Sequence, residues 1–230
     1  MNTQLRSIGL GCIVALLTAC AGTPPLKTTQ TSGFLSNYDA MTAVDTASAA
    51  HAWRWISPEI SQQRYQNLQI KPIEFFPAPT TTDQVSIDAL TQLTQSLNGT
   101  VQQSATANGV PLANAAGPRT LVLRSALTSV QLTNKSLKLH ELLPVALVLS
   151  GAELALGKRD KDVTVLLEYE FIDASTGKTV ISGVREDRGL RVANNTAQMT
   201  MKNAEPVLKD LVKDIDPEFK RLNQLFVSAR

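Results

Sequence analysis

Two glutamates are the residues of this chain whose type and spacing come nearest to a catalytic pair. Glu168 and Glu170 lie two positions apart in a segment that alternates apolar and polar side chains, so both project from one face of a predicted strand. Two carboxylates held close together can serve as acid and base in hydrolysis. Because alternation by itself places polar residues on the wet face of a sheet, we expect these glutamates to line a solvated face instead.

The supply of other reactive side chains is small. His51 and His140 are the two histidines, and neither has a histidine or cysteine neighbour at the spacing of metal ligands. No Gly-x-Ser-x-Gly elbow occurs, and the segment GAELALGK at 151–158 lacks the glycine spacing and the following Ser or Thr of a phosphate loop. The sequence therefore predicts no catalytic residue, no metal site and no cofactor, in a protein that is not an enzyme.

The elements around the glutamates are predicted from periodicity. Thr120 to Leu132 alternates as a long strand with a change of face near Ser125, and Val163 to Phe171 alternates more plainly. The turn Asp173 to Lys178 places Gly177 where a left-handed residue is needed, and the strand Thr179 to Val184 completes a hairpin.

Earlier and later segments add a broken strand and three helices. Leu68 to Phe76 is rich in β-forming residues, but Pro72 confines it to an edge or an interrupted strand. Apolar residues from Val85 to Val101 recur at helical spacing, after a cap at Thr82 or Asp83 and before Gly109. At the C-terminus, Asp216-Pro217-Glu218 predicts the start of a second of two abutting helices.

This order of elements predicts an α+β fold, a mostly antiparallel sheet with helices packed on one face. One domain, residues 33–230, is the simplest count, because no further linker or repeat follows the N-terminal region. With 43% hydrophobic and 18% charged residues the chain can build a core. A net charge of +2 without a basic run excludes nucleic acid as the expected partner.

The N-terminus predicts where the protein resides. Arg6 precedes an apolar run, Ile8 to Leu17, which is too short to span a bilayer and is typical of a signal peptide. The run ends in Leu17-Thr18-Ala19-Cys20, which resembles the lipobox of bacterial lipoproteins. That resemblance implies that residues 1–19 are removed and that Cys20 becomes the acylated first residue, a stable membrane anchor through its acyl chains.

Residues 20–32 then comprise the lipidated cysteine and a flexible tether that contains Pro24-Pro25. Ala21 follows the cysteine where an inner-membrane retention signal would usually place Asp. Similarity to sorted lipoproteins therefore implies the outer membrane and leaves the leaflet open; we expect the domain to face the periplasm. Since Cys12 leaves with the signal peptide and Cys20 carries lipid, no thiol remains for a disulfide.

Several short motifs resemble those of a known family. They are SGFLSNY at 32–38, Trp53-Arg54-Trp55, Tyr65 and Ile70-Lys71-Pro72. Together with the lipobox they resemble a family of Gram-negative lipoproteins catalogued as domain of unknown function 3313, over nearly the whole mature chain. The family implies no activity. The strand, helix and hairpin order also resembles periplasmic domains related to the curli secretion lipoprotein and the N-terminal domain of TolB, which implies partner binding or ring assembly.

Two segments are candidate contact surfaces. The stretch LLPVALVLSGAELAL at 142–156 is almost continuously apolar, and we expect a buried strand or helix there. The alternative is an exposed surface that meets the membrane or another subunit, through Leu142, Val145, Leu147 and Leu149. Trp53 and Trp55 share a face if their segment is a strand, and such a pair is more often core than interface.

The function predicted from the sequence is a lipid-anchored outer-membrane lipoprotein with a non-catalytic periplasmic domain for binding or assembly, an accessory component of a cell-envelope process. Its partners would be the membrane, through the acyl chains on Cys20, and another protein or copies of itself. One alternative is a self-assembling pore or secretion subunit. A second is a periplasmic hydrolase that uses Glu168 or Glu170 as acid or base.

Overall fold

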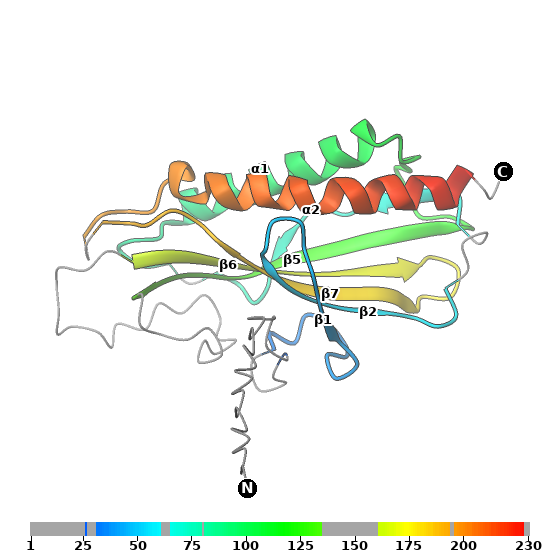
Figure 1. Cartoon of the computed structure of the whole chain (residues 1–230), viewed down its shortest axis with the longest axis horizontal. Helices are drawn as coiled ribbons and strands as arrows, with labels where there is room; N and C mark the ends of the chain where they lie inside the picture. Colours follow the sequence, from blue (N-terminus) through cyan, green and yellow to red (C-terminus); the bar gives the residue numbers. More distant parts are fainter. Residues whose placement is uncertain are drawn as a thin grey trace, which may run out of the picture.

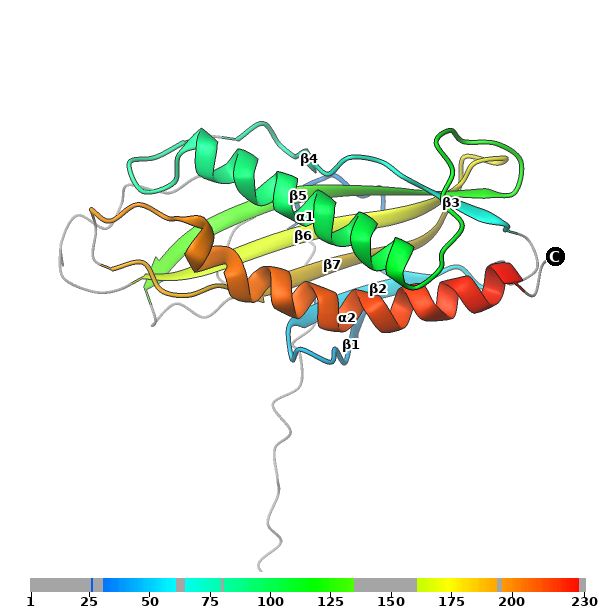
Figure 2. The same cartoon turned by 90° about the horizontal axis from the view of Figure 1, so that it is seen from above.

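Two helices lie on one face of a seven-stranded sheet in the computed structural model (Figure 1). The structure describes Leu26 and residues 31–60, 65–79, 81–134, 161–193 and 196–227. The elements are β1 (Thr42–Val44), β2 (His51–Ile56), β3 (Asn67–Ile70), β4 (Glu74–Phe75), α1 (Ile87–Ala107), β5 (Thr120–Asn134), β6 (Lys161–Asp173), β7 (Thr179–Arg188) and α2 (Met201–Val227). Seen from above, both helices run along the long strands (Figure 2).

The strand order is β1-β2-β7-β6-β5-β3, with β4 also paired to β5. All neighbours are antiparallel except β3 and β4, which pair with β5 in parallel. The predicted α+β class is therefore confirmed. Pro72 separates β3 from β4 as expected, because proline has no N–H to give to the ladder.

The predicted hairpin forms between β6 and β7. Gly177 has a φ of 68° and its N–H donates to the Asp173 carbonyl at 2.8 Å, as the turn requires. Val163, Val165 and Leu167 lie in the core between the sheet and the helices. β7 continues to Arg188, four residues beyond the predicted end.

The face change of β5 lies further along than predicted. The register shifts between Leu127 and Ser129, not near Ser125. Ser125 pairs with Tyr169 and lies on the same face as Leu123 and Leu127, so the face does not change at this polar residue. The extra residue is Thr128.

The start of α1 also differs from the prediction. Ser86 is the N-cap, its Oγ accepting from the Ala89 N–H at 3.1 Å. Thr82 instead closes a turn before the helix, since its backbone N–H donates to the Val85 carbonyl and its hydroxyl accepts from the Val85 N–H. The end of the helix is as predicted, with Gly109 at a φ of 70°.

The prediction of two C-terminal helices is wrong, because α2 runs unbroken through Pro206 and Pro217. Asp216 does not cap a new helix: its carboxylate accepts hydrogen bonds from Ser104 and Asn108 at the end of α1. The same face of α2 is buried on both sides of Pro217, by Val207 and Leu211 before it and by Phe219, Leu222 and Phe226 after it. This burial outweighs the roughly 3 kcal/mol that an interior proline costs.

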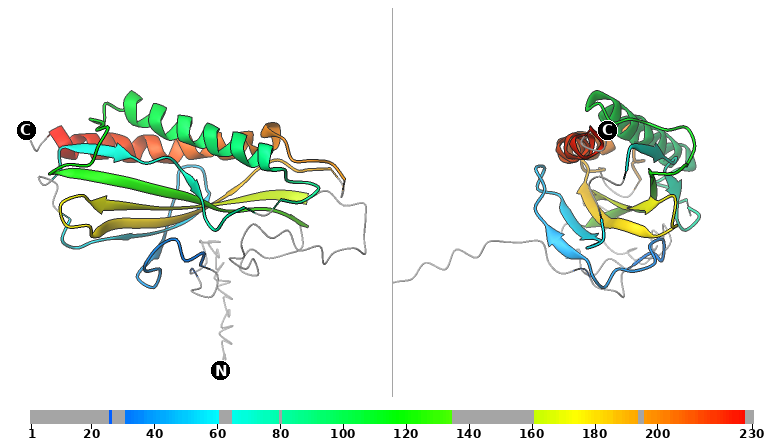
Figure 3. Two further views of the ribbon diagram at one scale, coloured as in Figure 1. Left: turned by 180° about the vertical axis from the view of Figure 1, so that it is seen from behind. Right: turned by 90° about the vertical axis from the view of Figure 1, so that its right-hand side faces the viewer.

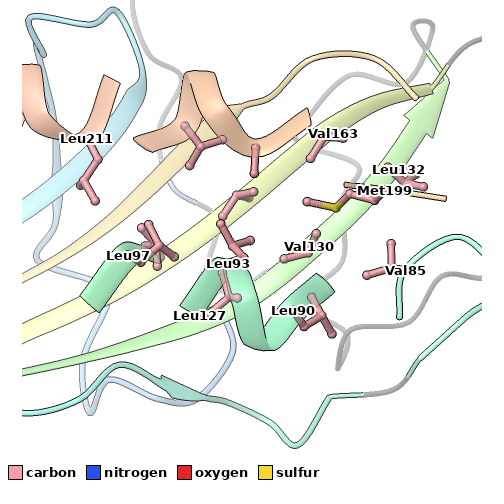
Figure 4. Close-up of a cluster of buried hydrophobic side chains, with 14 of the residues drawn as sticks. Val85, Leu90, Leu93, Leu97, Leu127, Val130, Leu132, Val163, Met199 and Leu211 are labelled. Atoms are coloured by element: carbon pink, nitrogen blue, oxygen red, sulfur yellow. The ribbon is translucent and has the colours of Figure 1, made fainter. Parts of the chain in front are cut away.

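The main core lies between the helices and the sheet (Figure 4). Leu90, Leu93 and Leu97 form the inner face of α1, where the 3 and 4 spacing predicted it. They belong to one cluster with Leu127 and Val130 of β5. A second cluster continues toward the C-terminal half of α2, around Phe226. The two clusters bury the face of the sheet that lies beneath the helices, and a different segment covers the other face.

The predicted signal peptide at 1–19, Cys20, most of the tether at 20–32, His140 and the apolar stretch at 142–156 lie outside the described residues. The interface candidates Leu142, Val145, Leu147 and Leu149 therefore stay predictions. Over the helices that are described, none is long and apolar enough to cross a bilayer.

Candidate functional site

The face of the sheet away from the helices carries the paired glutamates, and it is not solvated as predicted. Glu168 is 2% exposed and Glu170 is 4% exposed. Residues 31–41 cover this face, on the side of the sheet opposite α1 and α2 (Figures 1 and 3). The prediction failed because alternation shows which residues share a face, whereas a segment more than 120 positions earlier decides whether that face is wet.

Tyr38 closes the covering segment into a loop, Ser32 to Tyr38, and docks it. Its hydroxyl accepts from the Gly33 N–H at 3.1 Å and from the Leu35 N–H at 3.0 Å. The same hydroxyl donates to Glu168 Oε2 at 2.5 Å. Gly33 adopts a φ of 85°, which a glycine tolerates without strain. One phenol therefore satisfies two backbone donors and one buried carboxylate.

Apolar contacts hold the loop against the face of the sheet. Phe34 and Leu35 are buried against Trp53 of β2, Ala126 of β5 and Val184 of β7. Partly buried neighbours complete this second-face cluster, namely Leu26, Tyr38, Met41 and Phe76. Phe34 and Phe76 meet edge to face, with 5.6 Å between ring centroids. The motif SGFLSNY at 32–38 thus acts as a structural cover.

The two tryptophans take different positions on this face. They lie on β2 and share a face, as a strand requires, because Trp53 pairs with Val184 and Trp55 with Ser182. Trp53 is 6% exposed and belongs to the second-face cluster, so it is a core residue of the described chain. Trp55 is half-buried.

Glu170 is held by a different set of partners. Arg124 Nη1 donates to its Oε1 at 2.8 Å, and the Thr179 hydroxyl donates to its Oε2 at 2.8 Å. The Arg124 guanidinium also lies over the Phe34 ring, 4.1 Å from the centroid. The ion pair to Glu170 therefore also supports the loop.

Burial sets the proton affinities at the loop. It raises the pKa of Glu168 above the ordinary value, while the hydrogen bonds from Tyr38 and Ser32 act in the opposite direction. Burial and the Glu168 carboxylate raise the pKa of Tyr38 to about 12. Tyr38 therefore keeps its proton, and remains a donor, throughout the physiological pH range.

A second acid on the same face forms a pair that the sequence did not suggest. His51 of β2 lies opposite Glu186 of β7, with His51 Nδ1 3.3 Å from Glu186 Oε1. Burial raises the pKa of Glu186 to about 7 and lowers the pKa of His51, the Arg188 charge adding to the effect on His51. A protonated Glu186 can donate to a neutral His51. Only the pairing of β2 with β7 brings these residues together.

On the helix side, one arginine joins β7, α2 and the turn before β2. Arg185 binds Asp187 in bidentate fashion, at 2.5 Å and 2.7 Å, and also contacts Asp214 of α2. Ser48 donates to both Asp214 oxygens, through its N–H at 2.8 Å and its hydroxyl at 2.6 Å. Arg185 and Asp187 are almost fully buried. The arrangement resembles a structural junction more than an open site.

Across the described ranges, no three His, Cys, Asp or Glu side chains gather as a metal site would require. Glu168 and Glu170 are each bound by side chains of this chain, and so is Arg185 on the helix side. The covered face of the sheet holds the N-terminal segment in place.

Comparison with known proteins places the chain among bacterial lipoproteins. It is 34% identical to the protein named Uncharacterized lipoprotein YdcL of Escherichia coli (strain K12), over 93% of this chain and 95% of that protein. The family described as Protein of unknown function (DUF3313) matches residues 30–215. The chain belongs to this family, which confirms the resemblance predicted from its short motifs.

Solved structures with a related outline are more distant. One is a PelC dodecamer from Paraburkholderia phytofirmans, 14% identical with a TM-score of 0.38, over 76% of this chain and 97% of that one. Another is a putative neuraminyllactose-binding hemagglutinin homolog from Helicobacter pylori, 11% identical with a TM-score of 0.38, over 74% and 94%. At these TM-scores the similarity carries no argument about function.

Proposed function

We propose that the protein is an outer-membrane lipoprotein, acylated on Cys20, whose domain faces the periplasm and works by binding another envelope component without catalysis. The lipobox and the lipoprotein relative support the anchor. Ala21 supports sorting to the outer membrane, since it stands where a retention signal would place Asp.

The proposal that the domain works without catalysis rests on the burial and the hydrogen bonds of the two strand glutamates. A general acid or base must come within hydrogen-bond reach of the substrate. Glu168 and Glu170 are buried, and each already binds side chains of this chain: Tyr38 for the first, Arg124 and Thr179 for the second. The geometry supports a role for both acids in holding the loop.

The anchor is tested with Cys20→Ser, with Cys12→Ser as the matched control inside the signal peptide. We expect Cys20→Ser to lose incorporation of labelled palmitate and to leave the membrane fraction, because acylation supplies the attachment. Cys12→Ser should fractionate as the unaltered protein does. A Cys20→Ser protein that still sediments with outer membranes would contradict the proposal.

The binding role is tested on the purified, acylated protein in mild detergent. Light scattering on a sizing column, with the detergent subtracted, gives its mass: a multiple of the subunit identifies copies of this chain as the partner. A monomer directs the search to another protein, by crosslinking from the exposed side of α1 in intact cells. Hydrolysis of envelope material that disappears in a folded Glu168→Gln variant would overturn the non-catalytic assignment.

A further inference from the structure

Among the described residues, Leu26 is the nearest in sequence after Cys20, and it packs on the second face of the sheet. Leu26 is partly buried against the second-face cluster of Phe34, Leu35 and Trp53. It stands six positions after Cys20. A fully extended chain spans at most about 3.6 Å per residue, so Cys20 lies within roughly 20 Å of this cluster.

The chain is held to this face a second time a few residues later. The Tyr38 hydroxyl binds Glu168 and both backbone donors of its loop, and Phe34 and Leu35 are buried beneath it. Freeing the segment would expose these two side chains and leave Glu168 without its tyrosine donor. Each of these costs about 1 to 3 kcal/mol. The lipid anchor is therefore connected to the domain at one fixed position on this face.

The length of this attachment is short compared with the domain. The second-face cluster lies on β2, β7 and β5, which have neighbouring strands on both sides. Neighbouring strands lie about 4.8 Å apart. The helix layer lies about 10 Å above the sheet, and each helix is itself about 10 Å wide. A path from the cluster around the sheet edge to the outer side of α1 or α2 is thus roughly 30 Å, longer than the attachment.

We infer that the sheet face covered by the Ser32–Tyr38 loop is held toward the lipid headgroups, and that α1 and α2 point away from the membrane. The inference rests on the proposed acylation of Cys20 and adds an orientation to it. The surface left for a periplasmic partner is then the outer side of the helix layer. On α1 that side is almost uncharged, with exposed Thr91, Gln92, Gln95, Gln102 and Gln103.

The test compares the distances of two labels from a bilayer. The mature acylated protein has no other thiol, so Ser36→Cys on the loop and Gln95→Cys on α1 can each carry a single fluorophore; both positions are exposed. The acylated proteins are reconstituted in phosphatidylethanolamine and phosphatidylglycerol vesicles that contain a headgroup spin label. We expect several-fold stronger quenching at position 36 than at position 95.

Equal quenching at the two positions, or stronger quenching at position 95, would overturn the orientation. Flotation of the same samples separates this failure from that of the anchor: a protein that does not float with vesicles contradicts acylation itself. A variant that combines Leu26→Ser with Phe34→Ser frees the segment and should reduce the difference between the labels. A difference that persists unchanged would show that the segment does not set the orientation.

Discussion

The Tyr38 hydroxyl donates a 2.5 Å hydrogen bond to Glu168 Oε2, joining residues 130 positions apart. Tyr38 belongs to the loop that covers the second face of the sheet, and Glu168 belongs to the central strand β6. The contact connects the segment that follows the predicted lipid anchor to the middle of the fold. Its strength decides how firmly that segment is held.

Tyr38→Phe should lower the free energy of unfolding by about 1 to 3 kcal/mol, because it removes the donor to a buried carboxylate and the acceptor of two backbone N–H groups. The measurement is urea unfolding followed by tryptophan fluorescence, to which Trp53 in the same cluster contributes. A loss below about 0.5 kcal/mol would mean that the contact does not hold the loop.

A double-mutant cycle with Glu168→Met isolates the pair. The double variant contains neither an unpaired Glu168 carboxylate nor an unpaired Tyr38 hydroxyl, while the Gly33 and Leu35 N–H groups lose their acceptor equally in Tyr38→Phe and in the double variant. The double variant should therefore be more stable than the sum of the single losses predicts, by about 1 kcal/mol or more. Strictly additive losses would show that Tyr38 and Glu168 stabilise the fold independently.

The pair of His51 and Glu186 predicts opposite pH dependences for two variants. Burial raises the pKa of Glu186 from 4.5 to about 7, so its contribution to stability is complete below pH 4.5 and is lost as the pH rises through 7. The pKa of His51 is lowered from 6.5, so its contribution is present above pH 6.5 and is lost as the pH falls. In the unaltered protein the two effects oppose each other.

We therefore expect Glu186→Gln to gain stability relative to the unaltered protein as the pH rises from about 5 to 7, by about 2 to 3 kcal/mol. His51→Asn should lose relative stability over the same range. Urea unfolding at several pH values measures both differences, and comparison with the unaltered protein cancels the contributions of other acids. Parallel pH profiles for all three proteins would contradict the assignment.

Arg185→Met should cost about 3 to 5 kcal/mol, because it leaves the carboxylates of Asp187 and Asp214 close together without their cation. Thermal unfolding of the purified domain gives the loss. Lys213→Met is the matched control: Lys213 pairs with Asp210 at 2.6 Å on the surface of α2, and its removal should cost less than about 1 kcal/mol. Equal losses would mean that burial of the junction contributes nothing.

Two glycine substitutions should change stability in opposite directions. A Cβ on Gly183 would lie 2.6 Å from Tyr169 Cε1, so Gly183→Ala should cost about 1 to 3 kcal/mol, and Tyr169→Leu should relieve part of the loss. Gly99 is exposed within α1 with nothing near its Cβ position, so Gly99→Ala should stabilise by about 0.5 to 1 kcal/mol. Melting temperatures that shift in the same direction would contradict this comparison.

Several features were predictable because they are local. The apolar spacing of α1, the alternation of β6 and the turn at Gly177 depend on residues close in sequence, and the structure has all three. Family membership, which the comparisons show, also follows from short contiguous motifs. The lipobox at Cys20 is a signal of the same local kind and stays a prediction. By contrast, the unbroken course of α2 through Pro217 depends on burial against the sheet and α1, which no local rule contains.

The state of the candidate site was decided by the tertiary structure. The sequence determined that Glu168 and Glu170 share a face, because side chains alternate along any strand. It did not determine that the Ser32–Tyr38 loop covers this face, nor that His51 meets Glu186, because both depend on pairing between distant segments. Periodicity specifies the direction of a side chain, and only the packing of the whole chain decides whether that direction leads to water or to a partner.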